Sequence, residues 1–185
     1  MALFGLNFES VERYLESYGR YIIRQAESEL AVRSNTGSLA KSLDFTIFER
    51  DGGYEIRWTA ASYGEYIDKG VSGAIGKRYY YAIDGKRKRS PYSFVDKGPP
   101  IPILVDWIRS KGIQGRKPKG AKDSKGGQFI SRKSLAFLMS RKIKNYGLKS
   151  ISFYSKPISY SFKVFQQKLA ESFAEDVEVI LSQKL

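Results

Sequence analysis

The sequence predicts an α+β fold, in which long helices at the two ends of the chain pack on a small antiparallel sheet. Two stretches, at about 8–33 and 159–183, repeat apolar residues at spacings of three and four, as amphipathic helices do. Shorter stretches between them alternate apolar with polar residues, as strands do. Because 185 residues suit one domain with its own core, we expect a single domain over 1–185 that carries a basic helical and loop insertion at about 77–149.

One apolar stripe predicts the N-terminal helix. Its members recur every three or four residues, while charged residues occupy the other faces. Asn7 is a suitable N-cap, and the polar cluster at 34–37 ends the stretch. A stripe of this kind indicates a buried helix face, formed here by Phe8, Val11, Leu15, Tyr18, Ile22, Ala26 and Leu30.

The alternating stretch after this helix predicts a hairpin. Strands at about 43–50 and 53–60 flank Asp51-Gly52-Gly53, which supplies the positive-φ residues that a tight turn needs. The next segment, 61–69, fits either a short helix or an irregular connection.

The middle of the chain mixes strand-like runs with basic segments. Tyr79–Ile83 and Tyr92–Val95 are strand-like, and we expect the four consecutive cations at 86–89 to lie in the turn between them. A short helix follows at 103–111, with Leu104, Trp107 and Ile108 as its apolar residues. The stretch 115–127 has no large apolar side chain, so we expect a loop.

Two more helices complete the prediction. The first, at 131–146, places Leu135, Leu138, Met139 and Ile143 on one side, and Gly147 suits its C′ position. A strand-like run at 151–154 comes next. The last helix carries an apolar stripe of Phe162, Phe165, Leu169, Phe173, Val177 and Ile180.

Positive charge is concentrated in the insertion. The chain has 32 Lys and Arg against 19 Asp and Glu, a net charge of +13. Between Lys77 and Lys149 there are 20 cations and four acids, a balance of +16, whereas the rest has 12 cations and 15 acids, a balance of −3. Such a segment indicates a polyanionic neighbour, either nucleic acid or an acidic protein surface.

The missing residue types exclude several kinds of site. With no His and no Cys there is no Ser-His-Asp triad, thiolate nucleophile, disulfide or Cys/His zinc site. Asp68 with Asp84-Gly85-Lys86 loosely resembles the carboxylates and lysine of metal-dependent nucleases, but two turn acids beside solvated lysines explain the same pattern. We predict that the chain is not an enzyme and has no catalytic residue, cofactor or metal.

Two binding functions remain open from the residues alone. Tyrosines interleaved with cations at 79–94 suit nonspecific nucleic-acid binding, because aromatic rings stack on bases and cations neutralise phosphates. Alternating tyrosines are also ordinary strand residues, and basic loops bind acidic protein surfaces equally well.

The order of four motifs resembles the small neck and tail-completion proteins of tailed bacteriophages. Ser34–Leu43 (SNTGSLAKSL) is similar to their TGxLxxSI/L segment, and Tyr63–Gly70 (YGEYIDKG) to their YAxYVExG segment. Trp107–Ile113 and Leu135–Gly147 resemble the WIxxKGI and AFxIxxxIxxxG segments of longer members. The chain departs from the family at Asp68-Lys69, where Glu and an apolar or aromatic residue are more usual. It also has Ser152-Phe153-Tyr154 in place of the usual Pro-Phe, with Pro157 displaced.

The resemblance implies a structural virion protein. Such subunits form a homo-oligomeric ring, typically a hexamer or dodecamer, that joins head to tail and continues the channel for genomic DNA. Expected partners are the portal, connector or adaptor proteins, the tail tube or tail terminator protein, and the DNA. Because the N-terminus lacks the pattern of a signal peptide and no stretch approaches 18 apolar residues, we expect assembly in the host cytoplasm, location in the virion neck, and no membrane partner.

Two sets of contact residues follow from this expectation. The assembly or DNA-facing contacts, which we expect to order on assembly, are the cations of the expected turn and of the loop: Lys86, Arg87, Lys88, Arg89, Arg116, Lys117, Lys119, Lys122 and Lys125. The subunit-interface candidates are Tyr63, Tyr66, Ile67 and Asp68.

Overall fold

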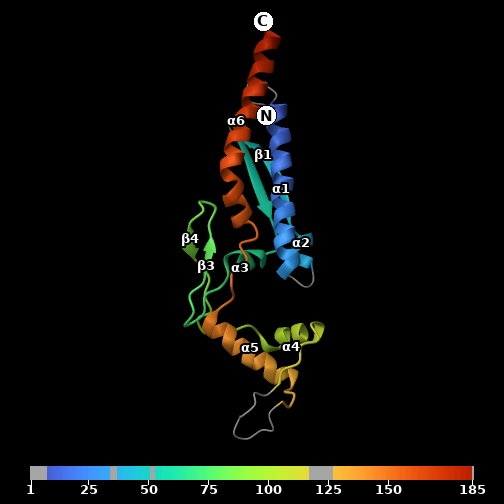
Figure 1. Ribbon diagram of the computed structural model, residues 1–185, viewed down its shortest axis with the longest axis vertical. Helices are drawn as coiled ribbons and strands as arrows, with labels where there is room; N and C mark the ends of the chain where they lie inside the picture. The colour runs from blue at the N-terminus through green and yellow to red at the C-terminus, as the bar shows by residue number, and fades with distance from the viewer. Residues whose placement is uncertain (1–7, 34–36, 51–52, 117–126, 185) are drawn as a thin grey trace. The chain divides into compact units, whose positions relative to one another are not determined.

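The computed structural model describes residues 8–33, 37–50, 53–116 and 127–184, which form two compact units (Figure 1). The first unit consists of the chain up to Lys69, residues 80–88 and the chain from Ile151 onward. The second consists of Gly70–Tyr79 and Arg89–Ser150. The predicted α+β class is confirmed, although the described strands form two separate two-stranded sheets instead of one.

Two long helices form the centre of the first unit. α1 (Glu9–Arg33) and α6 (Ser155–Lys184) lie side by side and run antiparallel, with the start of α1 beside Asp176 and Tyr18 beside Ser161 (Figure 1). Phe165 of α6 packs against the ring of Tyr18, with 4.3 Å between the ring centroids. All seven residues of the predicted α1 stripe are buried, so this prediction is confirmed.

A distant carboxylate caps the start of α1. The backbone N–H groups of Ser10 and Val11 each donate to an oxygen of the buried Asp176 carboxylate, both at 2.9 Å. These N–H groups belong to the first turn of the helix, where the helix itself provides no acceptor. The predicted cap, Asn7, lies outside the described residues.

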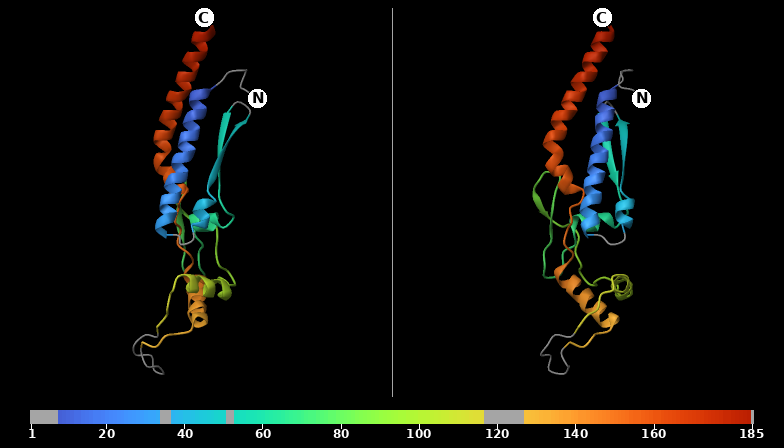
Figure 2. Two further views of the ribbon diagram at one scale, coloured as in Figure 1. Left: turned by 90° about the vertical axis from the view of Figure 1, so that its right-hand side faces the viewer. Right: turned by 45° about the vertical axis from the view of Figure 1, so that its right-hand side comes forward.

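The predicted hairpin is confirmed to within one residue. β1 (Asp44–Arg50) pairs antiparallel with β2 (Gly53–Thr59), in a register that sets Ile47 opposite Ile56. Figure 2 shows the hairpin lying along α1. A Cβ on Gly19 would lie 2.3 Å from the ring of Phe45, so the absence of a side chain at Gly19 lets β1 approach the helix this closely.

Two short helices close one end of the first unit. α2 (Ser38–Lys41) was not predicted. For the segment 61–69, where a short helix and an irregular connection were both open, the structure shows a helix, α3 (Gly64–Lys69). Leu39 of α2 packs with Phe153 in a buried cluster that also contains Ala26, Leu30 and Leu43.

The cationic segment is a strand instead of a turn, so that part of the prediction was wrong. β3 (Tyr79–Tyr81) pairs with β4 (Arg87–Arg89), and the turn lies at 82–86. Gly85 adopts a φ of 73°, and its N–H donates to the carbonyl oxygen of Ala82. The turn forms here because Asp84-Gly85 provides the residues that a tight hairpin requires.

The predicted strand at Tyr92–Val95 was also wrong. This stretch makes only two backbone hydrogen bonds to Ser72, from Ser72 N to the Tyr92 oxygen and from Phe94 N to the Ser72 oxygen, both 2.8 Å. They form an isolated bridge, which is too short to constitute a sheet.

Two helices pack together in the second unit. α4 (Ile101–Ser110) and α5 (Arg132–Tyr146) bury Leu104, Ile108 and Ala136 between them, and both predicted helices are confirmed with shifted ends. Ser131 caps α5 by accepting a hydrogen bond from Ser134 N, and Gly147 ends it as predicted. Two residues of the predicted apolar faces are exposed, however: Trp107 at 41% and Leu138 at 54%.

The strand expected at 151–154 was wrong as well. Ser152 has a φ of 55°, and its backbone N–H donates to the backbone carbonyl oxygen of Asp68. α6 begins directly after this turn, at Ser155. The positive φ breaks the extended run that alternation had predicted. In the α6 stripe, Phe162 and Phe173 remain 41% and 51% exposed.

We expect the Asp176 cap to contribute measurably to stability. Asp176→Ala leaves two backbone N–H groups of α1 without an acceptor and should lower the free energy of unfolding by about 1–3 kcal/mol. Glu178→Ala, an exposed acid on the same helix, is the matched control and should change it by less than about 0.5 kcal/mol. Equal urea midpoints for the two variants would contradict this role.

Gly147 should be among the least replaceable residues of the second unit. Its φ is 74°, and a Cβ there would lie 2.1 Å from the Val71 oxygen and 2.6 Å from the Gly73 nitrogen. Gly112 also has a positive φ, 61°, but open space around it, so Gly112→Ala is a control for a side chain at positive φ without close contacts. We expect Gly147→Ala to lower the melting temperature well below that of Gly112→Ala. Equal melting temperatures would show that the close backbone approach is unimportant.

Candidate functional site

The two units differ sharply in charge. The second unit contains 17 Lys and Arg against three Asp and Glu, a balance of +14. The first contains 15 against 16, a balance of −1. The excess positive charge of the chain therefore belongs to the residues of the second unit, four of whose cations lie outside the described residues.

The β3–β4 hairpin presents the first group of predicted contact residues. Arg87, Lys88 and Arg89 are all exposed in β4, and Lys86 is exposed in the turn before it. Lys88 forms an ion pair with Asp84 at 2.8 Å, and this pair lowers the pKa of Asp84 and raises that of Lys88. The expectation that these residues order on assembly stays a prediction.

The second group of predicted contacts is described only in part. Arg116 lies over the ring of Phe129, 4.7 Å from its centroid, and a single antiparallel bridge joins the two residues. Lys117, Lys119, Lys122 and Lys125 lie outside the described residues.

Apolar side chains are exposed beside the cations of α4 and α5. On α5, Arg141 lies 6.0 Å from the ring centroid of Phe137, and exposed Lys142 follows exposed Leu138 by about one helical turn. Aromatic residues mixed with arginine are typical of protein interfaces, and large exposed apolar residues indicate a binding surface. The exposed apolar residues of these two helices are Ile103, Trp107, Phe137, Leu138 and Tyr146.

The first unit carries an acidic groove of about 700 Å³ between α1 and the β1–β2 hairpin. Four carboxylates, those of Glu9, Glu12, Glu16 and Glu49, line it together with one guanidinium, that of Arg13. Half-buried Phe45, Ile47 and Tyr54 form its apolar part.

The pKa of Tyr54 reflects the burial of its side chain and the negative charge of this groove. Its hydroxyl donates to a carboxylate oxygen of Glu12 at 3.2 Å. Burial, and then the charge of Glu12, raise the pKa of Tyr54 to about 12. Both observations indicate that the groove favours positive charge.

A second groove of the first unit, of about 680 Å³, is mainly apolar. α1, β2 and α6 line it with residues that include Val11, Trp58 and Phe162. The Trp58 indole N–H is buried and has no hydrogen-bond partner among the described residues.

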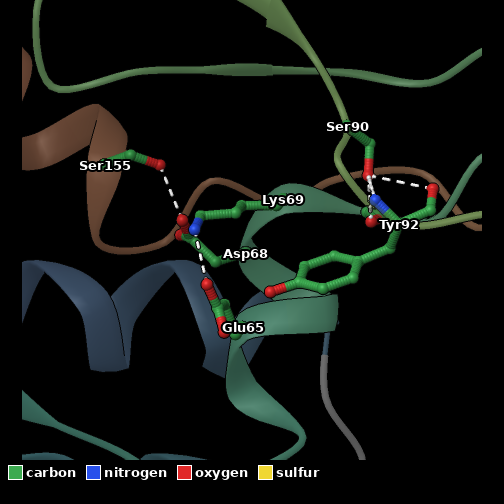
Figure 3. A network of polar contacts seen from close by, with 7 residues as sticks. Glu65, Asp68, Lys69, Ser90, Tyr92 and Ser155 are labelled. Atoms are coloured by element: carbon green, nitrogen blue, oxygen red, sulfur yellow. Dashed lines mark hydrogen bonds and ion pairs between the residues drawn. The ribbon is translucent and has the colours of Figure 1, made fainter.

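Asp68, a predicted subunit contact, is buried within the first unit and caps α6 (Figure 3). Its carboxylate accepts hydrogen bonds from Tyr154 N at 2.9 Å and from the Ser155 hydroxyl at 2.7 Å. Burial raises the pKa of Asp68 above its ordinary value, although these hydrogen bonds oppose the shift. Figure 3 also shows Lys69 paired with Glu65 and, in the second unit, the Ser90 hydroxyl accepting from Tyr92 N.

The other three interface candidates lie near Asp68 in the sequence but differ in exposure. Tyr63 and Tyr66 are 42% and 48% exposed, and Tyr63 shares a hydrogen bond of 3.1 Å with the Ser38 hydroxyl. Ile67 is half-buried against the cluster around Phe153. The two tyrosines are accessible to a partner, and their role as a subunit contact stays a prediction.

The residues of the nuclease alternative line one depression but are engaged elsewhere. Asp68 and Asp84 both border a hollow of about 840 Å³ in the first unit. Asp68 caps α6, whereas Asp84 accepts a hydrogen bond from Lys86 N and pairs with Lys88. Within the described ranges, no group of three or more acidic side chains is arranged to hold a metal ion.

Sequence reasoning missed Asp176 and the acidic groove. Asp176 comes three residues after Phe173 and one before Val177, so an acid falls on an otherwise apolar stripe, and this irregularity was a usable signal. The groove lies between α1 and the β1–β2 hairpin, and only the packing of the hairpin on α1 brings Glu49 close to the acids of the helix.

No family model, curated protein or solved structure matches the chain. Among the helices in the described part of the chain, none is long and apolar enough to cross a membrane.

The raised pKa of Asp68 predicts a particular pH dependence. Because the folded pKa lies above the unfolded value, folding binds a proton over the interval between them, and this residue's contribution to stability falls as pH rises through that interval. The difference in unfolding free energy, wild type minus Asp68→Asn, should therefore decrease from about pH 4 to pH 7. Urea unfolding at a series of pH values measures it.

Asp84→Asn provides a control of opposite sign. Lys88, the partner of Asp84, lowers the pKa of this carboxyl. The contribution of Asp84 to folding stability is therefore present above the unfolded pKa and is lost as pH falls. The difference between wild type and Asp84→Asn should increase with pH. If the Asp68 difference also increased with pH, burial would not dominate at Asp68.

Proposed function

We propose that this chain is a structural subunit of the neck of a tailed bacteriophage, which assembles into a ring between the portal and the tail and surrounds the path of the DNA. The observation that carries the proposal is the joint exposure of charge and apolar surface on the second unit. A balance of +14 there accompanies exposed Trp107, Phe137 and Leu138 on its two packed helices. The order of the four sequence motifs supports the same function.

Exposed apolar side chains lower the free energy only when a partner covers them, and a dense positive charge is stabilised by an acidic neighbour. A ring places both features of every subunit next to a neighbouring subunit or an adjoining ring. The function is mechanical and needs no catalytic group.

The decisive test is the oligomeric state of the purified chain. We expect native mass spectrometry and electron microscopy to detect a closed ring of about six or twelve copies, alone or with portal and tail proteins of the same virion. A chain that stays monomeric and binds neither set of proteins would contradict the proposal.

Nonspecific nucleic-acid binding is the second candidate, and the β3–β4 hairpin favours it. Tyr79 and Tyr81 are 46% and 42% exposed in β3, and the three residues of β4 are exposed cations. This candidate requires DNA affinity in the isolated monomer that falls steeply with salt and is lost when Lys86–Arg89 are neutralised. Negligible affinity at low salt would contradict it.

A further inference from the structure

We propose that the exposed face of α5 docks into the acidic groove of the first unit of a second copy of this chain. The α5 face consists of Phe137, Leu138, Arg141 and Lys142. The inference rests on the proposed self-assembly and adds to it the two surfaces that meet. Because these surfaces differ, the contact is head-to-tail, and repeating it gives a closed ring or an open filament.

Charge complementarity selects the occupant. The lining of the groove has four carboxylates and one guanidinium, a formal balance of −3, and Arg20, which lies outside the lining, pairs with one of these carboxylates, that of Glu16. The described part of α5 carries only cations, with no acid among its 15 residues. An acidic protein surface or DNA could neutralise α5 as well, but neither would use the groove, whereas a second copy supplies both partners at once.

The apolar parts also correspond. The groove is floored by half-buried Phe45, Ile47 and Tyr54. Phe137 and Leu138 are 48% and 54% exposed on α5, although Leu138 belongs to an apolar pattern that normally faces a core. An amphipathic helix that places its apolar residues into an apolar groove with a rim of opposite charge is a common mode of recognition.

The lengths of the two surfaces agree. Glu9 and Glu16 are seven residues apart on α1, which corresponds to about 10 Å along a helix axis. Phe137 and Lys142 are five residues apart on α5, which corresponds to about 8 Å. The basic and apolar residues of the α5 face therefore fit within the line of carboxylates.

A charge-swap experiment tests the contact. In the acidic variant of α5, Arg141→Glu and Lys142→Glu are combined; in the basic variant of the groove, Glu16→Lys and Glu49→Lys are combined. All four positions are exposed, so both variants should fold, as circular dichroism can verify. Sedimentation velocity should find each variant associating at least about tenfold more weakly than the wild type, and an equimolar mixture regaining association.

Two controls separate this contact from general charge effects. Lys97→Glu with Arg109→Glu makes the same reversal at exposed cations outside α5, and should leave association within about twofold. Phe137→Ala keeps every charge but should weaken association, because the aromatic anchor is lost.

The outcomes divide clearly between the two proposals. Rings that persist in both charge-swap variants would overturn the inference and leave the neck function standing, and so would weakened variants whose mixture fails to associate. Loss of DNA binding in the α5 variant with unchanged self-association would assign α5 to DNA instead. A wild-type chain that never associates, even with portal and tail proteins, would overturn both proposals.

Discussion

Two buried carboxylates determine where the long helices of the first unit begin. Asp176 of α6 accepts the first N–H groups of α1, and Asp68 of α3 accepts those at the start of α6. Each bond satisfies a group that a helix terminus leaves without a partner, and each joins segments far apart in the sequence. The antiparallel pairing of α1 with α6 aligns their apolar stripes, and the hairpin packs on α1 through the space left by Gly19.

The sequence predicted the helices and the first hairpin well, because their signals come from residues close together in the chain. The α1 stripe is buried as expected because its periodicity marks one helix face, and the Asp51-Gly52-Gly53 signal predicted the first hairpin to within one residue. The cations of β4 were assigned to a turn because they follow Asp84-Gly85 between two strand-like runs. The strand forms nevertheless, since its side chains stay in water and Asp84 offsets one of the charges.

The candidate surfaces were less accessible from the sequence, because they depend on packing across elements. The charge of the second unit was evident from composition, but its exposed apolar residues were not. Leu138 and Trp107 lie in helical patterns that suggest a core, and only the packing of α4 against α5 shows that both side chains face outward. Asp68 was expected at a subunit interface because it belongs to the YGEYIDKG segment that resembles the phage family. Its carboxylate instead accepts a hydrogen bond from Ser155, at the start of a helix that begins 87 residues later.

Zero-length carbodiimide cross-linking tests most directly whether the α5 face of one copy contacts the acidic groove of another copy. The reagent joins lysines to carboxylates in contact, and an equal mixture of ¹⁴N- and ¹⁵N-labelled chains distinguishes cross-links between copies from those within one. If the α5 face docks into the groove, we expect mixed-isotope peptides that join Lys142 on α5 to Glu12, Glu16 or Glu49 in the groove. Mixed-isotope cross-links at other sites of the assembled protein, with none between these two surfaces, would contradict the docking of α5 into the groove of another copy.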